Sequence, residues 1–215
     1  MRLIKTDLTI KEVQPKIKEL VNELFKLVPA GVGCKSDLKL NNNEFKEMTE
    51  TGAKWAIEKG MGWNQDLERI EDHGVISFAD SSKISNRAMQ RGFNQVGTLG
   101  SGNHYLEVQI NHASDIFDTD IAKKIGIHSD KQVLVMVHCG SRGVGHQIAT
   151  DYLKKFDEIM QKYKISIPDR ELSCAPFQSE EGQNYYKAMA CAANMAYANR
   201  QVITHKIREA FQKTF

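Results

Sequence analysis

The chain has 215 residues, and its 29 lysines and arginines against 27 aspartates and glutamates give a formal net charge of +2. A charge this close to balance excludes a dedicated nucleic-acid coat protein, because such a protein works through a long-range positive field. The four cysteines form no CxxC pair, and no apolar run reaches membrane-spanning length, so a disulfide scaffold and a membrane protein are excluded and a cytoplasmic location is expected.

Helical stretches with clear stops fill the first part of the chain. After a short extended segment, a capping-box pattern precedes apolar residues at helical spacing that continue to Val28. Pro15 suggests that the regular part of this helix begins there. A second helix is expected over residues 44–59, and a short basic helix over residues 82–92.

The second part of the chain predicts one strand and two long helices. Residues 133–137 are all apolar, which suits a strand buried on both faces. Helical spacing predicts a long amphipathic helix over residues 144–163 and another from about residue 180 to the end. Strand and helix signals do not alternate regularly, which disfavours a doubly wound parallel sheet. We expect a single α+β domain over residues 1–215, with mixed sheet strands packed against several long helices.

A glycine-rich turn follows the buried strand, in the segment Val137-His138-Cys139-Gly140-Ser141-Arg142-Gly143. A strand, a glycine turn and a helix in this order point backbone amides and the positive helix end at an anion. Arg142 could hold a phosphate with two hydrogen bonds. Glycines are equally needed where a chain only reverses tightly, so a purely structural role stays open.

An earlier glycine-rich segment, Gly97-Thr98-Leu99-Gly100-Ser101-Gly102-Asn103-His104-Tyr105-Leu106-Glu107, ends in a strand pattern. Alternation places Asn103, Tyr105 and Glu107 on one face and His104 and Leu106 on the other. An amide, an aromatic ring and a carboxylate in register could contact phosphate, stack on a base and accept hydrogen bonds from base N–H groups. His104 could share their site only near the strand's start, where the glycine turn breaks the alternation.

Two histidines stand at strand ends, His104 in the first segment and His138 in the second. Imidazole is a common ligand of transition metals, and the two rings could meet in space although 34 residues separate them. Either one alone is better explained as a hydrogen-bonded histidine beside a turn. Cys139 is a candidate nucleophile, although a small buried residue at a strand end is the better interpretation.

Four segments together resemble one protein family. They are Gly97-Thr98-Leu99-Gly100-Ser101-Gly102-Asn103-His104, His138-Cys139-Gly140-Ser141-Arg142-Gly143, Gln178-Ser179-Glu180-Glu181-Gly182 and Ala198-Asn199-Arg200-Gln201. In combination they are similar to the RtcB family of RNA ligases, in the form found in archaea, over essentially the whole chain. The resemblance implies a manganese- and GTP-dependent enzyme of tRNA splicing or RNA repair. Such an enzyme joins RNA 2′,3′-cyclic phosphate or 3′-phosphate ends to 5′-hydroxyl ends.

The resemblance also implies the site residues. They are two manganese ligands (His104 and His138), three nucleotide contacts (Asn103 for phosphate, Tyr105 and Glu107 for guanine) and a contact to RNA or nucleotide phosphate (Arg142). In the family, an Asp and a Cys that bind metal lie in a motif just upstream of the position of Met1. A further histidine ligand and the guanylylated histidine lie downstream of the position of Phe215. We therefore expect a central portion of the catalytic domain that is inactive alone.

Two other functions stay open. One is a different metal-dependent phosphoesterase or nucleotidyl enzyme, in which Glu107 is a general base and the histidines hold the metal. The other is a non-catalytic scaffold that a partner chain complements with the missing motifs. RNA and GTP are the expected partners, and exposed strand edges favour association with the missing ligase segments or with a second copy.

Overall fold

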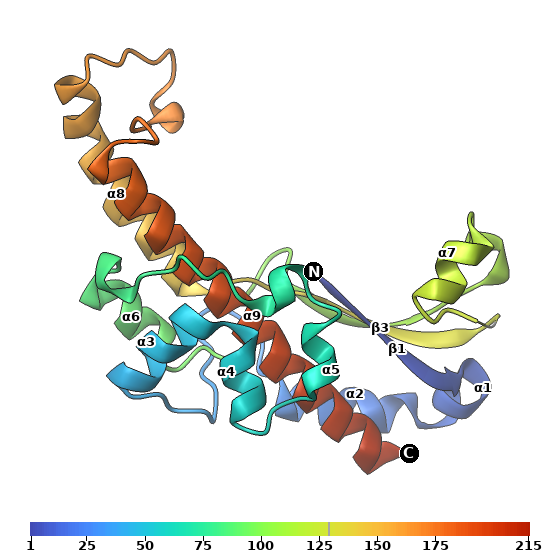
Figure 1. The fold of residues 1–215 in the computed structure, drawn as a ribbon. Helices are drawn as coiled ribbons and strands as arrows, with labels where there is room; N and C mark the ends of the chain where they lie inside the picture. The colour runs from blue at the N-terminus through green and yellow to red at the C-terminus, as the bar shows by residue number, and fades with distance from the viewer. Residues whose placement is uncertain (129) are drawn as a thin grey trace. The chain divides into compact units, whose positions relative to one another are not determined.

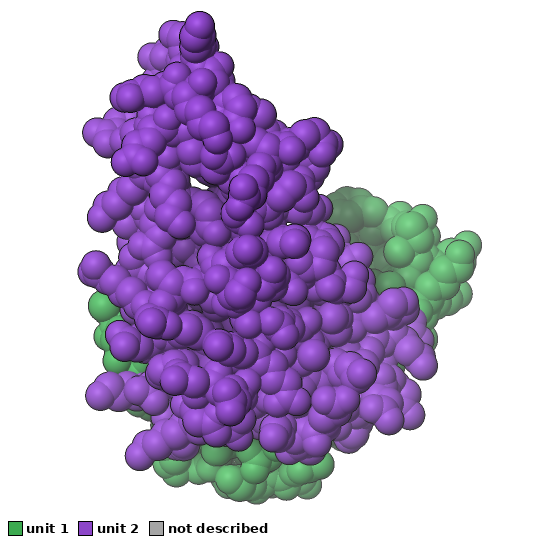
Figure 2. Space-filling view, turned by 60° about the vertical axis from the view of Figure 1, so that its left-hand side comes forward, with its two compact units in different colours: residues 1–34, 98–139, 203–215 green, residues 35–97, 140–202 purple. Residues whose placement is uncertain are grey.

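The computed structural model describes residues 1–128 and 130–215. They form two compact units: unit 1 is Met1–Cys34, Thr98–Cys139 and Ile203–Phe215, and unit 2 is Lys35–Gly97 and Gly140–Val202 (Figure 2). Each unit has its own apolar core, and the single domain expected over the whole chain stays a prediction. Within the described residues, no helix combines the length and apolar character that crossing a bilayer requires.

Unit 1 is built on a small antiparallel sheet with strand order β1-β3-β2 (Figure 1). The strands are β1 (Arg2–Thr9), β2 (Tyr105–Ile110) and β3 (Gln132–His138). Val135 in the central strand pairs with Ile4 on one side and Val108 on the other. Residues directly opposite each other share a face of the sheet, so this row turns toward the core. The α+β class is confirmed, and these three strands all pair antiparallel.

Helices pack on the apolar face of this sheet. Unit 1 contains α1 (Ile10–Val13), α2 (Ile17–Leu27), α7 (Thr119–Lys124) and the last part of α9 (Glu180–Thr214). Leu20 of α2 and Ile207 of α9 are almost fully buried with Val133, Val135 and Val137 in one cluster. A fully buried side chain of this size contributes about 1.5–3 kcal/mol, so the valine-rich strand anchors the unit.

Unit 2 is helical. Its helices are α3 (Asn42–Thr51), α4 (Ala53–Glu58), α5 (Asn64–Leu67), α6 (Asn86–Gly92), α8 (Gly143–Lys162) and the first part of α9. The core includes Phe45, whose ring meets Phe93 edge to face with centroids 5.2 Å apart. Buried amides supplement this packing. The side chain of Asn194 accepts from the backbone N–H of Ile76 (2.7 Å) and donates to the carbonyls of Thr49 (3.0 Å) and Glu50 (3.2 Å).

The two long helices predicted from the sequence are confirmed and form an antiparallel pair in unit 2 (Figure 1). Tyr152 of α8 packs on Tyr185 of α9 with ring centroids 5.1 Å apart, and its hydroxyl donates to the carbonyl of Asn184 at 3.1 Å. Burial raises the pKa of Tyr152 to about 12, because a phenolate is poorly solvated there.

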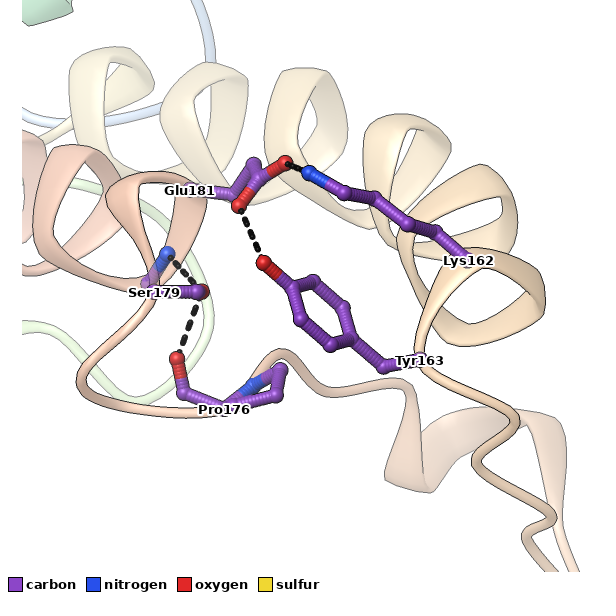
Figure 3. Close-up of polar contacts among 6 residues, drawn as sticks. Lys162, Tyr163, Pro176, Ser179 and Glu181 are labelled. Atoms are coloured by element: carbon purple, nitrogen blue, oxygen red, sulfur yellow. Dashed lines mark hydrogen bonds and ion pairs between the residues drawn. The ribbon is translucent and has the colours of Figure 1, made fainter.

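Polar contacts join the end of α8 to the start of α9 (Figure 3). Lys162 Nζ lies 2.7 Å from Glu181 Oε1, and Tyr163 Oη donates to Glu181 Oε2 at 3.3 Å. The hydrogen bond from Lys162 holds the pKa of the Glu181 carboxyl below its usual range. Ser179 Oγ donates to the carbonyl of Pro176 at 2.7 Å and accepts from the backbone N–H of Gly182 at 3.1 Å. The segment of residues 178–182, one of the four that resemble the family, therefore lies at the start of α9, where the connection from α8 ends.

Two expected helices are interrupted. The stretch over residues 44–59 forms α3 and α4, separated by Gly52, whose φ is +59°. A side chain at Gly52 would collide with the carbonyl of Gly74, so a contact distant in sequence sets this break. Near the N-terminus, α1 is separated from α2 by a 3-10 turn that contains Pro15, because proline removes a helical donor. The regular helix α2 begins at Ile17, close to the expected start.

Candidate functional site

The polar end of the sheet in unit 1 brings Tyr105 and His138 together. They are direct partners in the β2–β3 ladder and therefore lie on the same face. Their rings meet edge to face at 86°, with centroids 5.3 Å apart, and both side chains are half-buried. The Tyr105 hydroxyl also approaches two sulfur atoms, Met1 Sδ at 3.5 Å and Met136 Sδ at 3.6 Å. The ladder thus fixes where the His138 imidazole stands.

The glycine turn brings His104 to the same place. His104 directly precedes β2, and Gly102 two residues earlier has a φ of +70°. The His104 and His138 ring centroids are 6.0 Å apart, with planes inclined by 50°. Simple strand alternation would send His104 to the opposite face from Tyr105. The expectation that this histidine joins the site only where the turn breaks the alternation is therefore confirmed.

A backbone carbonyl orients His104. Its Nδ1 lies 2.8 Å from the carbonyl oxygen of Ser101, and a carbonyl can only accept, so Nδ1 carries the proton. The lone pair of a neutral ring is then on Nε2, which is the arrangement found in metal-ligating histidines. Sequence reasoning missed the role of Ser101. The signal available was the turn itself, since a glycine at positive φ between Ser101 and His104 predicts a reversal there.

The two rings are imidazoles, a common ligand of transition metals, and their centroids lie 6.0 Å apart. Within residues 1–128 and 130–215, no group of three or more His, Cys, Asp and Glu side chains is placed to hold a metal ion. Two imidazoles are fewer donors than a complete coordination shell requires.

Tyr105 and Glu107 share the polar face of β2, as alternation predicted, while Leu106 and Val108 pack toward the core. The Glu107 carboxylate is exposed and accepts from Gln109 Nε2 at 2.8 Å. Asn103 is exposed in the turn before the strand rather than within it. An aromatic ring and a carboxylate two residues apart on one face offer stacking and hydrogen-bond acceptance to a base.

Arg142 belongs to unit 2, at the residue before α8. Its φ of +54° and ψ of −139° are strained for a residue with a side chain. Such backbone conformations cost about 1–3 kcal/mol and gather at functional sites. The neighbouring glycine has a different purpose: a Cβ on Gly143 would lie 3.1 Å from both Arg91 Nε and Gln95 Oε1. Arginine, and not a glycine, adopts the positive φ of this turn.

Asn199 anchors both glycine segments where they enter unit 2. Its side chain is fully buried; Oδ1 accepts from the backbone N–H of Gly97 at 2.6 Å and Nδ2 donates to the carbonyl of Gly140 at 3.0 Å. Gln201 is also fully buried, and its Nε2 lies 2.8 Å from Asp66 Oδ2. These motif residues are structural here. Cys139 is buried, with Sγ 3.3 Å from the carbonyl of Thr98, which supports its interpretation as a packing residue.

Comparison with known proteins places this geometry in a family context. Residues 1–215 match the family described as tRNA-splicing ligase RtcB. Similar proteins named tRNA-splicing ligase RtcB occur in Pyrococcus horikoshii (54% identity over the whole chain, 24% of that protein) and Methanococcus maripaludis (50% over the whole chain, 44% of that protein). Another is found in Nanoarchaeum equitans (52% identity over 99% of the chain, 44% of that protein). The chain thus spans less than half the length of these relatives.

Proposed function

The chain belongs to the RtcB family of tRNA-splicing ligases, and we propose that it carries part of an active site for joining RNA ends. The reaction joins a 2′,3′-cyclic phosphate or 3′-phosphate end to a 5′-hydroxyl end, using GTP and manganese, in tRNA splicing or RNA repair. The observation that carries this proposal is the pair of imidazoles, 6.0 Å apart, at the polar end of the sheet. Cysteines that form no disulfide among the described residues support a cytoplasmic location.

Each site residue has a task in this proposal. His104 and His138 would hold manganese, with His104 oriented by the carbonyl of Ser101. When bound, the metal would neutralise phosphate charge and orient the reacting groups. Asn103 would donate its amide to nucleotide phosphate, and Arg142 would bind phosphate of the RNA end or the nucleotide through its guanidinium.

The guanine base would lie on the polar face of β2. Tyr105 presents an aromatic ring there and Glu107 an exposed carboxylate on the same face. A carboxylate accepts hydrogen bonds from paired N–H groups, which guanine offers and adenine lacks on the corresponding edge. We therefore assign base selection to Glu107 and base stacking to Tyr105.

The ligand count bears on activity of the isolated chain. Two imidazoles alone chelate a metal weakly, because each lost ligand removes binding energy. We propose that the 215-residue chain becomes active only with the remaining ligase segments. RNA and GTP are then its substrates, and those segments are its partner.

Complementation tests this proposal. The chain is mixed with the flanking segments of the M. maripaludis ligase, GTP and manganese, and joining of a 3′-phosphate RNA to a 5′-hydroxyl RNA is measured. We expect joining only in the complete mixture. His104→Ala and His138→Ala should each lower the rate more than about 100-fold, since removing even an outer partner of a ligand costs 10–100-fold.

His112→Ala is the matched control, because this histidine is exposed and outside the site; its rate should equal that of the original chain. Guanylylation by the isolated chain would refute the partial site. Phosphoester hydrolysis by the isolated chain without GTP would instead favour the phosphoesterase function. Joining that survives both site substitutions would leave the chain as a scaffold.

A further inference from the structure

The outer face of α6 in unit 2 carries two arginines. The helix sequence Asn-Arg-Ala-Met-Gln-Arg-Gly contains no acidic residue. Ala88, Met89 and Gly92 are buried, whereas Arg87 and Arg91 are exposed. Residues four apart are neighbours on one side of a helix, so the two guanidinium groups share the solvent side of α6.

Arg91 extends this positive surface onto α8. Its Nη1 donates to Gln147 Oε1 at 3.1 Å and lies 3.4 Å from Nδ1 of the exposed His146. Arginine can only donate, so His146 Nδ1 acts as the acceptor in this contact. The proton of a neutral ring is then on Nε2, on the side away from Arg91. The surface formed by the exposed side chains of Arg87, Arg91 and His146 is here named the α6 ridge.

The carboxylate that follows His146 most closely in the sequence of α8 already accepts hydrogen bonds. Asp151 is the first acidic residue of that helix. It accepts from Ser85 Oγ at 2.6 Å and from Gln147 Nε2 at 2.7 Å. These bonds hold the Asp151 carboxylate beside Ser85 at the start of α6 and against Gln147, which also accepts from Arg91. The two arginines of the α6 ridge outnumber this one carboxylate, and their guanidinium groups are donors that suit a polyanion.

We propose that the α6 ridge binds the phosphodiester backbone of the RNA substrate. This inference rests on the proposed function and deepens it by naming a surface for RNA outside the histidine pair. Contacts of this kind carry no sequence information and depend on salt concentration. Arg87 and Arg91 supply positive charge, and the exposed imidazole of His146 supplies a further hydrogen-bonding group.

The test measures RNA binding without metal or GTP. A fluorescein-labelled, 3′-phosphorylated single-stranded RNA of about 20 nucleotides is titrated with the chain in EDTA at several salt concentrations. Arg87→Gln should weaken binding about two- to fivefold, as for an exposed ion pair. The double variant Arg87→Gln with Arg91→Gln should weaken it about tenfold. Its slope of log affinity against log salt should fall by about 1.4, because each lost contact removes about 0.7.

The matched control removes the same charge elsewhere in unit 2. Lys54→Gln with Lys154→Gln, both exposed positions on other helices, should change affinity less than about twofold. Arg87→Gln alone keeps the Arg91 contacts with α8, and thermal melting confirms that each variant is folded. The proposal is overturned if the original chain binds no RNA, or if ridge variants match the control. It is also overturned if the ridge variants bind an acidic peptide such as polyglutamate more weakly but bind RNA as tightly as the original chain does.

The RNA-binding test of the α6 ridge and the complementation test of the ligase function can fail independently. His112→Ala, at an exposed histidine outside both the histidine pair and the α6 ridge, should keep the metal-free RNA affinity of the original chain. If complementation fails while the ridge variants still lose RNA affinity and salt slope, only the ligase function is refuted. If complementation succeeds and the ridge variants bind RNA like the control, only the ridge is refuted.

Discussion

Two motif asparagines, Asn103 in unit 1 and Asn199 in unit 2, lie in opposite environments. In unit 1, Asn103 and Glu107 are exposed, and His104 and His138 are half-buried at the end of a sheet. In unit 2, the buried amide of Asn199 is bonded to backbone groups of Gly97 and Gly140. An exposed motif residue is available to a ligand, whereas a buried and satisfied one holds the fold. The same kind of residue in a motif can therefore have either purpose.

The largest effect on stability is expected when the same substitution, asparagine to alanine, is made at a motif position in each unit. Asn199→Ala should lower the free energy of unfolding by about 3 kcal/mol, because it leaves buried N–H and C=O groups without their partner. Asn103→Ala, at an exposed position, should change it by less than about 0.5 kcal/mol. Urea unfolding followed by circular dichroism measures both. Equal effects would contradict the division between exposed and buried motif residues.

A second test compares a buried valine with an exposed valine of unit 1. Val135 is fully buried in the central strand, while Val32 is 89% exposed in a loop of the same unit. Val135→Ala should cost about 2 kcal/mol of unfolding free energy, from lost burial. Val32→Ala should cost almost nothing. Thermal unfolding of the two variants compares them directly, and a small effect at Val135 would show that the sheet is not the anchor of unit 1.

Alkaline pH tests the burial of polar groups in unit 2. The pKa of Tyr152 is raised from 10.0 to about 12 by burial, so between these values the unfolded chain releases a proton that the folded chain keeps. Stability contributed by this group is complete below pH 10 and is lost as pH rises toward 12. Over that window the original chain should lose about 1–2 kcal/mol more than Tyr152→Phe. Equal slopes of unfolding free energy against pH would contradict the burial.

The smallest expected contrast is between two helix starts. Asn41 Oδ1 accepts from the backbone N–H groups of Asn43 and Glu44 at 2.9 and 3.0 Å. The Thr9 hydroxyl in unit 1 instead donates to the Glu12 carboxylate at 2.9 Å. Asn41→Ala should therefore cost about 1 kcal/mol and Thr9→Ala about half of that or less. The urea midpoints of the two variants measure this difference. A larger cost for Thr9→Ala would contradict the conclusion that Asn41 is the stronger helix cap.

Local patterns predicted most of the elements. The all-apolar segment became the central strand β3, and helical spacing predicted α8 and α9 close to their bounds. The break at Gly52 was not predicted, since a single glycine within a helical pattern is tolerated and a contact with Gly74 decides it. Networks that join distant segments, such as that of Asn194, leave no local pattern in the sequence.

The candidate site was predicted in part. The sequence allowed His104 and His138 to meet because both stand at strand ends, and the structure places their ring centroids 6.0 Å apart. The carbonyl of Ser101 that orients His104 was missed, because its effect depends on the exact turn geometry. The structural role of Asn199 was also missed, because its partners Gly97 and Gly140 lie 102 and 59 residues away. The roles of Asn103, Tyr105, Glu107 and Arg142 stay predictions.

The strained backbone at Arg142 has a consequence for substitution at this position. Glycine adopts a φ of +54° without the steric conflict that a Cβ creates. Arg142→Gly would therefore relieve the backbone strain at this position and remove the guanidinium at the same time. Engineered stabilisation of this protein should leave that residue alone.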